Sequence, residues 1–193
     1  MSALRTAATG LALLLLALVG ASPSAQPSTA ALALDAPLGD GPVYRVEIDG
    51  MIDNALAAYV LRALSDAEAD SASVVIFQID TFGGLLDAAD EIGKAILSSP
   101  VPTVAVIDRN AASAGALIAY ANDKIVMVPG ASMGAATAVN QTGEYAPEKI
   151  QSYTRGLMRA TAEATGRDPQ IAEAMVDETI DIPGVSPEGT LLT

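Results

Sequence analysis

The sequence predicts an α/β fold in which strands and helices alternate in layers. Residues 74–79 and 103–107 are β-branched apolar runs, which is typical of strands buried in a parallel sheet. The segments beside them have apolar residues at helical spacing. Alternating strands and helices are the pattern of layered α/β proteins, and 193 residues are enough for one such domain.

The expected strands are placed by composition and by the turns that end them. The first covers 43–48, where apolar and polar residues alternate up to the turn signal Asp49-Gly50. The two β-branched runs follow. A fourth strand at 125–128 is closed by Pro129-Gly130.

Helices are expected between and after these strands. Apolar residues recur three and four positions apart in each segment, which is the period of one helix face. By this criterion we expect helices at 54–69, 85–97, 112–120, 147–165 and 169–176. Gly166 ends the longest of them.

The N-terminal part has the pattern of a leader and a linker. Residues 1–21 resemble a secretory signal peptide, with small residues that favour cleavage near 21 or 25. Their apolar core is shorter than the roughly 20 residues a membrane span needs, so cleavage is favoured over an uncleaved anchor. Residues 22–42 are rich in Pro, Ala and Ser and are expected to be a linker. The folded domain is therefore expected at 43–193.

Composition excludes several classes of function. The chain has 10 basic and 23 acidic residues, a net charge of −13, which argues against binding to nucleic acid. It has no His and no Cys, which excludes a Ser-His-Asp triad, a Cys-His pair, a Cys/His zinc site and a disulfide. Hydrolytic chemistry would have to use Ser, Thr, Lys, Tyr or carboxylates. We expect neither a cofactor nor a metal.

Two junctions between a strand and a helix could carry chemistry. Asp80-Thr81-Phe82-Gly83-Gly84 follows a buried strand, and its glycines can leave backbone N–H groups uncovered for an oxyanion. An ordinary turn would look the same. Ala111-Ala112-Ser113-Ala114-Gly115 places a hydroxyl among small residues at a helix N-terminus, which favours developing negative charge. On this segment alone, a role for Ser113 as a helix cap or packing residue is favoured.

A third junction, Ala146-Pro147-Glu148-Lys149-Ile150, places a lysine in the first turn of a helix. A cation there opposes the helix dipole, which suits a general base, although a solvated surface lysine fits as well. Of the three lysines in the chain, Lys94 lies on a polar helix face and Lys124 in a tight turn. In a chain without His, a Ser-Lys dyad is the natural way to activate Ser113.

These segments, with Pro129-Gly130-Ala131-Ser132-Met133-Gly134-Ala135 between them, follow the order seen in the NfeD family. From 43 to 182 the chain resembles the membrane-bound serine proteases of the ClpP class in that family. The resemblance implies a layered ClpP/crotonase-like fold. In the family a further helix and strand usually close the domain, so we expect this fold to be truncated at the C-terminus.

The resemblance also implies roles for individual residues. Ser113 would be the nucleophile and Lys149 the general base. The oxyanion hole would be formed by amides near Gly83, Gly84 and Ala114. Many relatives have Pro where this chain has Phe82, which we interpret as tolerated variation.

The function expected on this basis is an exported serine endopeptidase that uses a Ser-Lys dyad. The resemblance implies a peptide or protein substrate with an apolar segment and a stomatin-like membrane partner. We also expect a homo-oligomer, a dimer, and a location that is extracytoplasmic or periplasmic and membrane-associated in the full-length protein. The alternative is a non-catalytic scaffold of membrane organisation that partners stomatin-like proteins. An acyl-CoA enzyme is a third class, against which the acidic charge counts.

Overall fold

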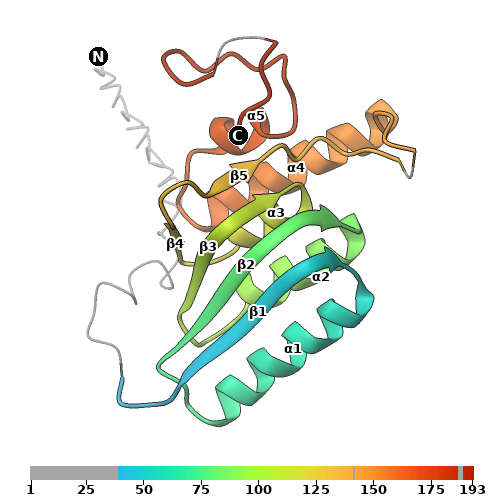
Figure 1. Cartoon of the computed structure of the whole chain (residues 1–193). Coiled ribbons are helices and arrows are strands. Elements are labelled where there is room, and N and C mark those ends of the chain that lie inside the picture. The colour runs from blue at the N-terminus through green and yellow to red at the C-terminus, as the bar shows by residue number, and fades with distance from the viewer. Residues whose placement is uncertain (1–38, 141, 187–188) are drawn as a thin grey trace, which may run out of the picture.

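The computed structural model describes residues 39–140, 142–186 and 189–193 (Figure 1). The predicted leader at 1–21 and most of the predicted linker lie outside these residues. In chain order the elements are β1 (Val43–Ile52), α1 (Asn54–Ala69), β2 (Val74–Gly84), α2 (Leu86–Leu97), β3 (Thr103–Ala112), α3 (Ala114–Tyr120), β4 (Lys124–Met127), β5 (Ser132–Gly134), α4 (Glu148–Ala164) and α5 (Pro169–Ala174).

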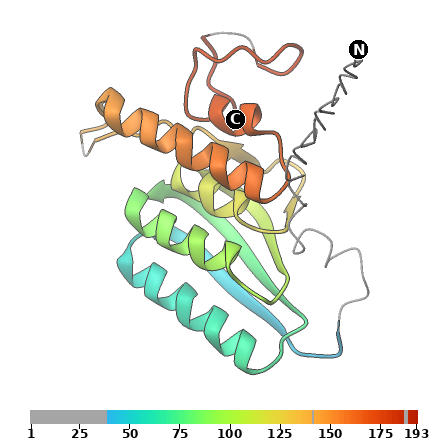
Figure 2. The same cartoon turned by 180° about the vertical axis from the view of Figure 1, so that it is seen from behind.

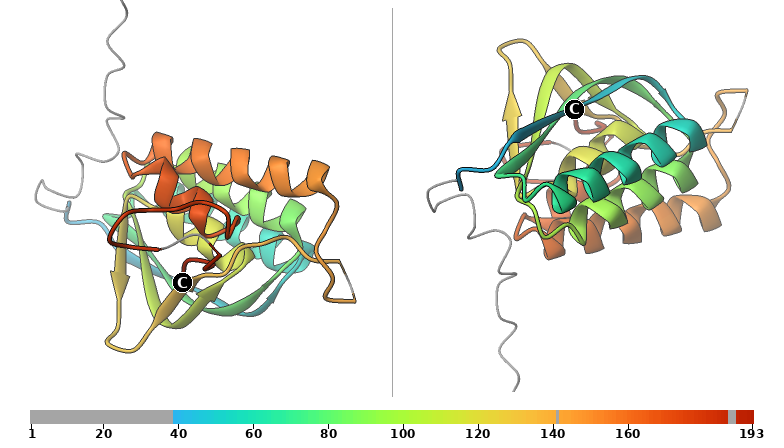
Figure 3. Two further views of the ribbon diagram at one scale, coloured as in Figure 1. Left: turned by 90° about the horizontal axis from the view of Figure 1, so that it is seen from above. Right: turned by 90° about the horizontal axis from the view of Figure 1, so that it is seen from below.

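The strands form one parallel sheet, as the buried β-branched runs predicted. Its order is β1-β2-β3-β4, and β5 pairs with the carboxyl end of β3 beyond β4. The strands face the viewer in Figure 1, and the helices α1, α2 and α4 face the viewer in Figure 2. Seen from above and from below, the helices form one layer and the sheet another (Figure 3). The expected α/β layer fold is confirmed.

The core lies between these two layers. In β2, Val75, Phe77 and Ile79 are fully buried, whereas Ile76 and Gln78 on the alternate face are half-buried. This period of two is that of a strand with one face on the core. Because parallel strands run in the same direction, their carboxyl ends meet at one edge of the sheet, where α/β folds place ligand sites.

Three strands, β1, β2 and β3, extend further than the sequence predicts, and β3 continues beyond 107 to Ala112. β1 continues beyond Asp49 to Ile52, so the predicted turn at Asp49-Gly50 is wrong. Gly50 has φ +76° and the register with β2 shifts around it, so this glycine makes a β-bulge instead of ending the strand. β2 likewise continues to Gly84, which pairs with Ile52. The glycine pair thus lies on a strand end held by β1.

The helices lie within two residues of their predicted starts. α3 begins at Ala114, two residues later than expected, because Ser113 adopts a backbone conformation that no helix contains. β5 was not predicted from the sequence; it is a three-residue strand. Within the described ranges no helix is long and apolar enough to cross a membrane.

Candidate active site

Ser113 lies in a strained turn between β3 and α3. Its φ is +54° and its ψ is −123°, outside the left-handed helical region that non-glycine residues occasionally adopt. Such conformations cost on the order of 1–3 kcal/mol and persist where the surroundings enforce them. Here the Ser113 N–H donates to the carbonyl of Gly134 at 2.9 Å, and the Ser113 carbonyl accepts from the N–H of Ala116 at 3.0 Å. Hydrogen bonds on both sides therefore hold the turn.

The hydroxyl of Ser113 does not cap α3. The residue occupies the N-cap position, but its side chain makes no capping hydrogen bond. Among the described residues no hydrogen bond to its Oγ is found, although the side chain is half-buried. The capping interpretation is therefore not supported, and the hydroxyl is available to a ligand.

Small residues let neighbouring elements approach the serine closely. A Cβ placed on Gly83 would lie 2.6 Å from the Cβ of Ser113 and 3.0 Å from its Oγ. A Cβ on Gly115 would lie 2.5 Å from Cγ2 of Thr81. A Cβ on Gly84 would lie 2.1 Å from the carbonyl oxygen of Ile52. Each position is therefore closed to any side chain without movement of its neighbours.

Thr81 belongs to the candidate segment Asp80–Gly84, but the sequence analysis gave its side chain no role. Its side chain is 1% exposed, and its hydroxyl donates to the carbonyl of Gly50 in the β1 bulge. The Gly83 N–H donates to Thr81 Oγ1 at 3.0 Å, so in this structure that amide already has an acceptor. Nothing in the sequence of the Asp80–Gly84 segment indicates that the Thr81 hydroxyl contacts Gly50 and Gly83.

Ala114 has a backbone N–H that, unlike the N–H of Gly83, is not already donating to another described residue. As the first residue of α3, its N–H has no acceptor within the helix. The described part of the chain offers it none elsewhere. It directly follows Ser113, which is the position expected for an oxyanion donor.

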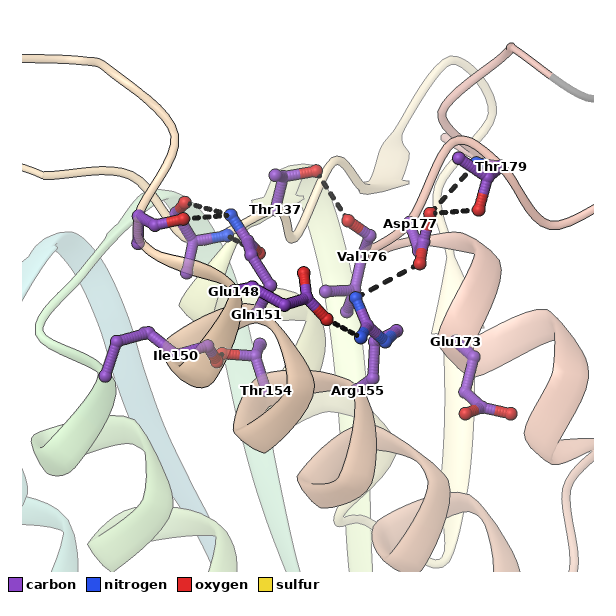
Figure 4. Close-up of polar contacts among 12 residues, drawn as sticks. Thr137, Glu148, Ile150, Gln151, Thr154, Arg155, Glu173, Val176, Asp177 and Thr179 are labelled. Carbon is purple, nitrogen blue, oxygen red and sulfur yellow. Dashed lines mark hydrogen bonds and ion pairs between the residues drawn. The ribbon is translucent and has the colours of Figure 1, made fainter.

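A pocket of about 200 Å³ opens beside Ser113 and is mostly apolar. Its walls come from the start of α2, from α3, from the segment after β5 and from α4. They are formed by Gly84, Leu85, Leu86, Ser113, Ala114, Leu117, Ala136, Ala138, Val139, Ile150, Thr154 and Met158. The hydroxyl of Thr154 donates to the carbonyl of Ile150 at 2.9 Å, so Ser113 offers the one unengaged hydroxyl among these residues (Figure 4).

Lys149 lies in the first turn of α4, as predicted, but its side chain is exposed and does not line the pocket. Its neighbour Ile150 does. Tyr153, one turn further on, donates to Asp90 of α2 at 3.4 Å, so Lys149 belongs to the flank of α4 that faces α2. We find no hydrogen bond or ion pair of Lys149 with any described residue. Lys94, by contrast, pairs with Asp90 at 2.6 Å.

A second, larger cavity of about 400 Å³ lies between α4 and the chain after α5 (Figure 4). Arg155 bridges it, with one ion pair to Glu148 at 2.5 Å and another to Asp177 at 3.1 Å. Hydrogen bonds from Thr179 and the charge of Arg155 lower the pKa of Asp177 below its ordinary value. These paired charges hold the C-terminal segment against α4. Ser113 does not line this cavity.

The described residues contain no group of three or more acidic side chains arranged to hold a metal. Around Ser113 lie backbone amides and the apolar pocket, whereas Lys149 is outside the pocket lining. Solved structures with a similar architecture include serine proteases of the ClpP class. ClpP1 from Listeria monocytogenes is 25% identical with a TM-score of 0.56, over 67% of this chain and 76% of that one.

The chain belongs to the NfeD family. Residues 42–193 match the family model described as NfeD1b, N-terminal domain. The membrane protein NfeD1b of Bacillus subtilis (strain 168) is 39% identical over 152 residues, which are 78% of this chain and 35% of that protein. The membrane-bound protease PH1510 of Pyrococcus horikoshii is 32% identical over 148 residues, 72% of this chain and 34% of that one. The chain thus spans about a third of the length of these relatives.

The protease domain named 1510-N, which is described as membrane-bound and stomatin-specific, is similar in structure. It has been solved as a serine-to-alanine variant and as a lysine-to-alanine variant in complex with a substrate peptide. The latter has a TM-score of 0.67 and 33% identity, over 72% of this chain and 67% of that one. The chain is therefore homologous to a ClpP-like serine protease.

Proposed function

We propose that this chain carries the catalytic domain of an exported serine endopeptidase, with Ser113 as nucleophile and Lys149 as general base. The observation that carries the proposal is the strained turn at Ser113, which presents an unengaged hydroxyl to an apolar pocket. Backbone strain of this kind persists at functional sites. A serine with only a packing role would gain nothing from it.

The chemistry follows from these groups. Lys149 takes the proton of Ser113 as Oγ attacks the carbonyl carbon of a peptide bond. Negative charge develops on the carbonyl oxygen and is stabilised by the N–H of Ala114, together with amides of the Gly83-Gly84 pair. The C–N bond breaks and the leaving amine receives the proton from Lys149. Water then hydrolyses the acyl-enzyme and restores the hydroxyl.

Lys149 must move to act in this way. Its backbone is one residue from Ile150, which lines the pocket, and its four-carbon side chain is flexible. No ion pair within the described residues holds it elsewhere, whereas Lys94 is paired with Asp90. The Gly83 amide must likewise leave Thr81 if it is to reach the oxyanion. We propose that a bound peptide brings about both changes.

The substrate is proposed to be an apolar peptide segment. Three large apolar residues that line the pocket, Leu85, Val139 and Ile150, are also exposed to solvent. Phe82, beside the glycine pair, is 82% exposed. Contiguous exposed apolar surface marks a binding site. Because the related 1510-N is described as stomatin-specific, we propose a stomatin-like membrane protein as partner.

Labelling with a serine-reactive fluorophosphonate tests the nucleophile. We expect mass spectrometry of the labelled protein to find one adduct, on the peptide that contains Ser113, and none in Ser113→Ala. An adduct on another serine would contradict the assignment. Binding of apolar peptides without labelling and without cleavage would favour the non-catalytic scaffold.

Export and assembly are separate proposals. If residues 1–21 are a cleaved signal, secreted material should begin near Ser22 or Gln26. Mature protein that retains Met1 would contradict cleavage and favour an N-terminal anchor. The expected dimer is tested by sedimentation of the mature chain, which should give twice the monomer mass.

A further inference from the structure

Gln151 joins α4 to the wall of the serine pocket through its side-chain amide. The residue is 8% exposed. Its Oε1 accepts from the N–H of Ala138 at 3.2 Å, and its Nε2 donates to the carbonyl of Ala138 at 2.7 Å (Figure 4). Nε2 also approaches the carbonyl of Ala146 at 3.5 Å. The side-chain amide of Gln151 therefore both donates to and accepts from the backbone of Ala138.

The residues that Gln151 holds belong to the candidate site. Ala138 and its neighbour Val139 line the pocket beside Ser113. The carbonyl of Ala138 also accepts from the N–H of Ala146 at 2.9 Å, which closes the base of the hairpin that leads into α4. One buried side chain thus fixes the pocket wall, the hairpin base and the first turn of α4 relative to one another.

The chemistry of the contact restricts which side chain can make it. A buried N–H and a buried carbonyl are costly without partners. A carboxamide offers one acceptor and two donors, which matches this arrangement. An ionised carboxylate offers only acceptors and would face the Ala138 carbonyl without a donor. A protonated carboxyl again offers one donor and one acceptor.

We propose that Gln151 is a positioning residue of the peptidase. It keeps the pocket wall at Ala138 in place relative to the helix turn that bears Lys149, so that substrate and base meet at Ser113. The catalytic part of this inference rests on the proposed function, whereas the structural part does not. Misplacing reacting groups by about 1 Å can lower a rate by roughly 100-fold.

Two variants test the positioning role in the mature full chain. Gln151→Leu removes all hydrogen bonds of the side-chain amide, and Gln151→Glu removes the donor only while its carboxyl is ionised. We expect both to lower kcat/KM for an apolar peptide by about 10- to 100-fold at neutral pH. The activity of Gln151→Glu relative to wild type should then rise as the pH is lowered and the carboxyl is protonated. The activity of Gln151→Leu relative to wild type should not change with pH.

The matched control is Gln170→Glu, the same chemical change at an exposed position of α5. Its activity should equal that of wild type at each pH. Cleavage by Gln151→Glu within twofold of wild type at neutral pH would overturn the positioning role. So would an identical pH dependence of the Glu and Leu variants.

Hydrogen exchange separates failure of this inference from failure of the proposed function. In Gln151→Leu, the amides of Ala138 and Ala146 should exchange at least about tenfold faster, with protection in α1 and β2 unchanged. Unchanged exchange at Ala138 would refute the contact whether or not the protein cleaves peptides. If wild type is inactive but the exchange changes as expected, the proposed function fails while the contact stands.

Discussion

Gly83 and Ser113 approach so closely that a Cβ on Gly83 would lie 2.6 Å from the Cβ of Ser113. The glycine also has φ +112°, a conformation that residues with a side chain rarely adopt. The end of β2 and the turn at Ser113 therefore fit together only if residue 83 has no side chain. Since the chain holds Gly83 between Thr81 and Ser113, a methyl group there should displace the serine.

Gly83→Ala should consequently lower peptide cleavage by about 100-fold, because the serine turn must shift by several tenths of an ångström or more. The control is Gly130→Ala, which also has a positive φ, +89°, but no atom within 4 Å of the added Cβ. It should lose about 1 kcal/mol of stability and keep its activity. Equal activity losses in both variants would show that backbone strain, not the contact with Ser113, is responsible.

The backbone strain at Ser113 should lower the free energy of unfolding by a measurable amount. Ser113→Ala keeps the Cβ and its strain at φ +54°, whereas Ser113→Gly relieves it. We expect the glycine variant to be more stable than the alanine variant by about 1 kcal/mol in urea unfolding. The strain account would be wrong if the alanine variant were the more stable of the two.

Lys149→Arg should be as inactive as Lys149→Ala, because a guanidinium does not give up its proton at accessible pH. The expected loss of kcat is about 100- to 10,000-fold, the usual contribution of a general base. Lys94→Ala breaks the ion pair with Asp90 on the exposed side of α2 and should remain active. Cleavage by Lys149→Arg at the wild-type rate would show that this residue supplies only charge or packing.

Acid should weaken the attachment of the C-terminal segment. The pKa of Asp177 is held below its ordinary value, first by the hydroxyl and N–H of Thr179 and also by Arg155. A carboxyl with a depressed pKa stabilises the fold above the ordinary pKa of about 3.9 and loses that contribution as the pH falls through the depressed value. Asp177→Asn should therefore be less stable than wild type by up to about 1 kcal/mol at pH 6, with the difference shrinking below about pH 4.

Urea unfolding at a series of pH values measures this difference. Asp181→Asn changes an exposed aspartate of the same segment and serves as the matched control. A stability difference for Asp177→Asn that stays constant down to pH 2 would contradict the coupling.

The order of strands and helices was predictable because each element has its own hydrophobic period. The β-branched run in β2 predicts a buried strand, and the apolar spacing in α2 predicts a helix with one buried face. Where β1 ends was not predictable from the same signals. Asp49-Gly50 is the sequence of a turn, and only pairing with β2 turns it into a bulge within a longer strand.

The place of Ser113 between a strand and a helix was predictable, but the backbone geometry there was not. Ser113 among small residues indicated a close approach, yet the hydrogen bond from its N–H to the carbonyl of Gly134, 21 residues further along the chain, is one that no local pattern encodes. The roles of Thr81 and Gln151 were missed for a related reason. Each acts through a contact with a residue distant along the chain or outside its own element, Gly50 for the first and Ala138 for the second.

Cleavage of an apolar peptide by wild type and by Ser113→Ala is the most direct test of the central claim that Ser113 is the nucleophile of a peptidase. Both proteins should be purified as the mature chain and compared by circular dichroism to establish equal folding. Products are then identified by mass spectrometry over time. We expect wild type to cut the peptide at defined bonds and Ser113→Ala to release at least about 1000-fold less product. Equal cleavage by the two proteins would contradict the account.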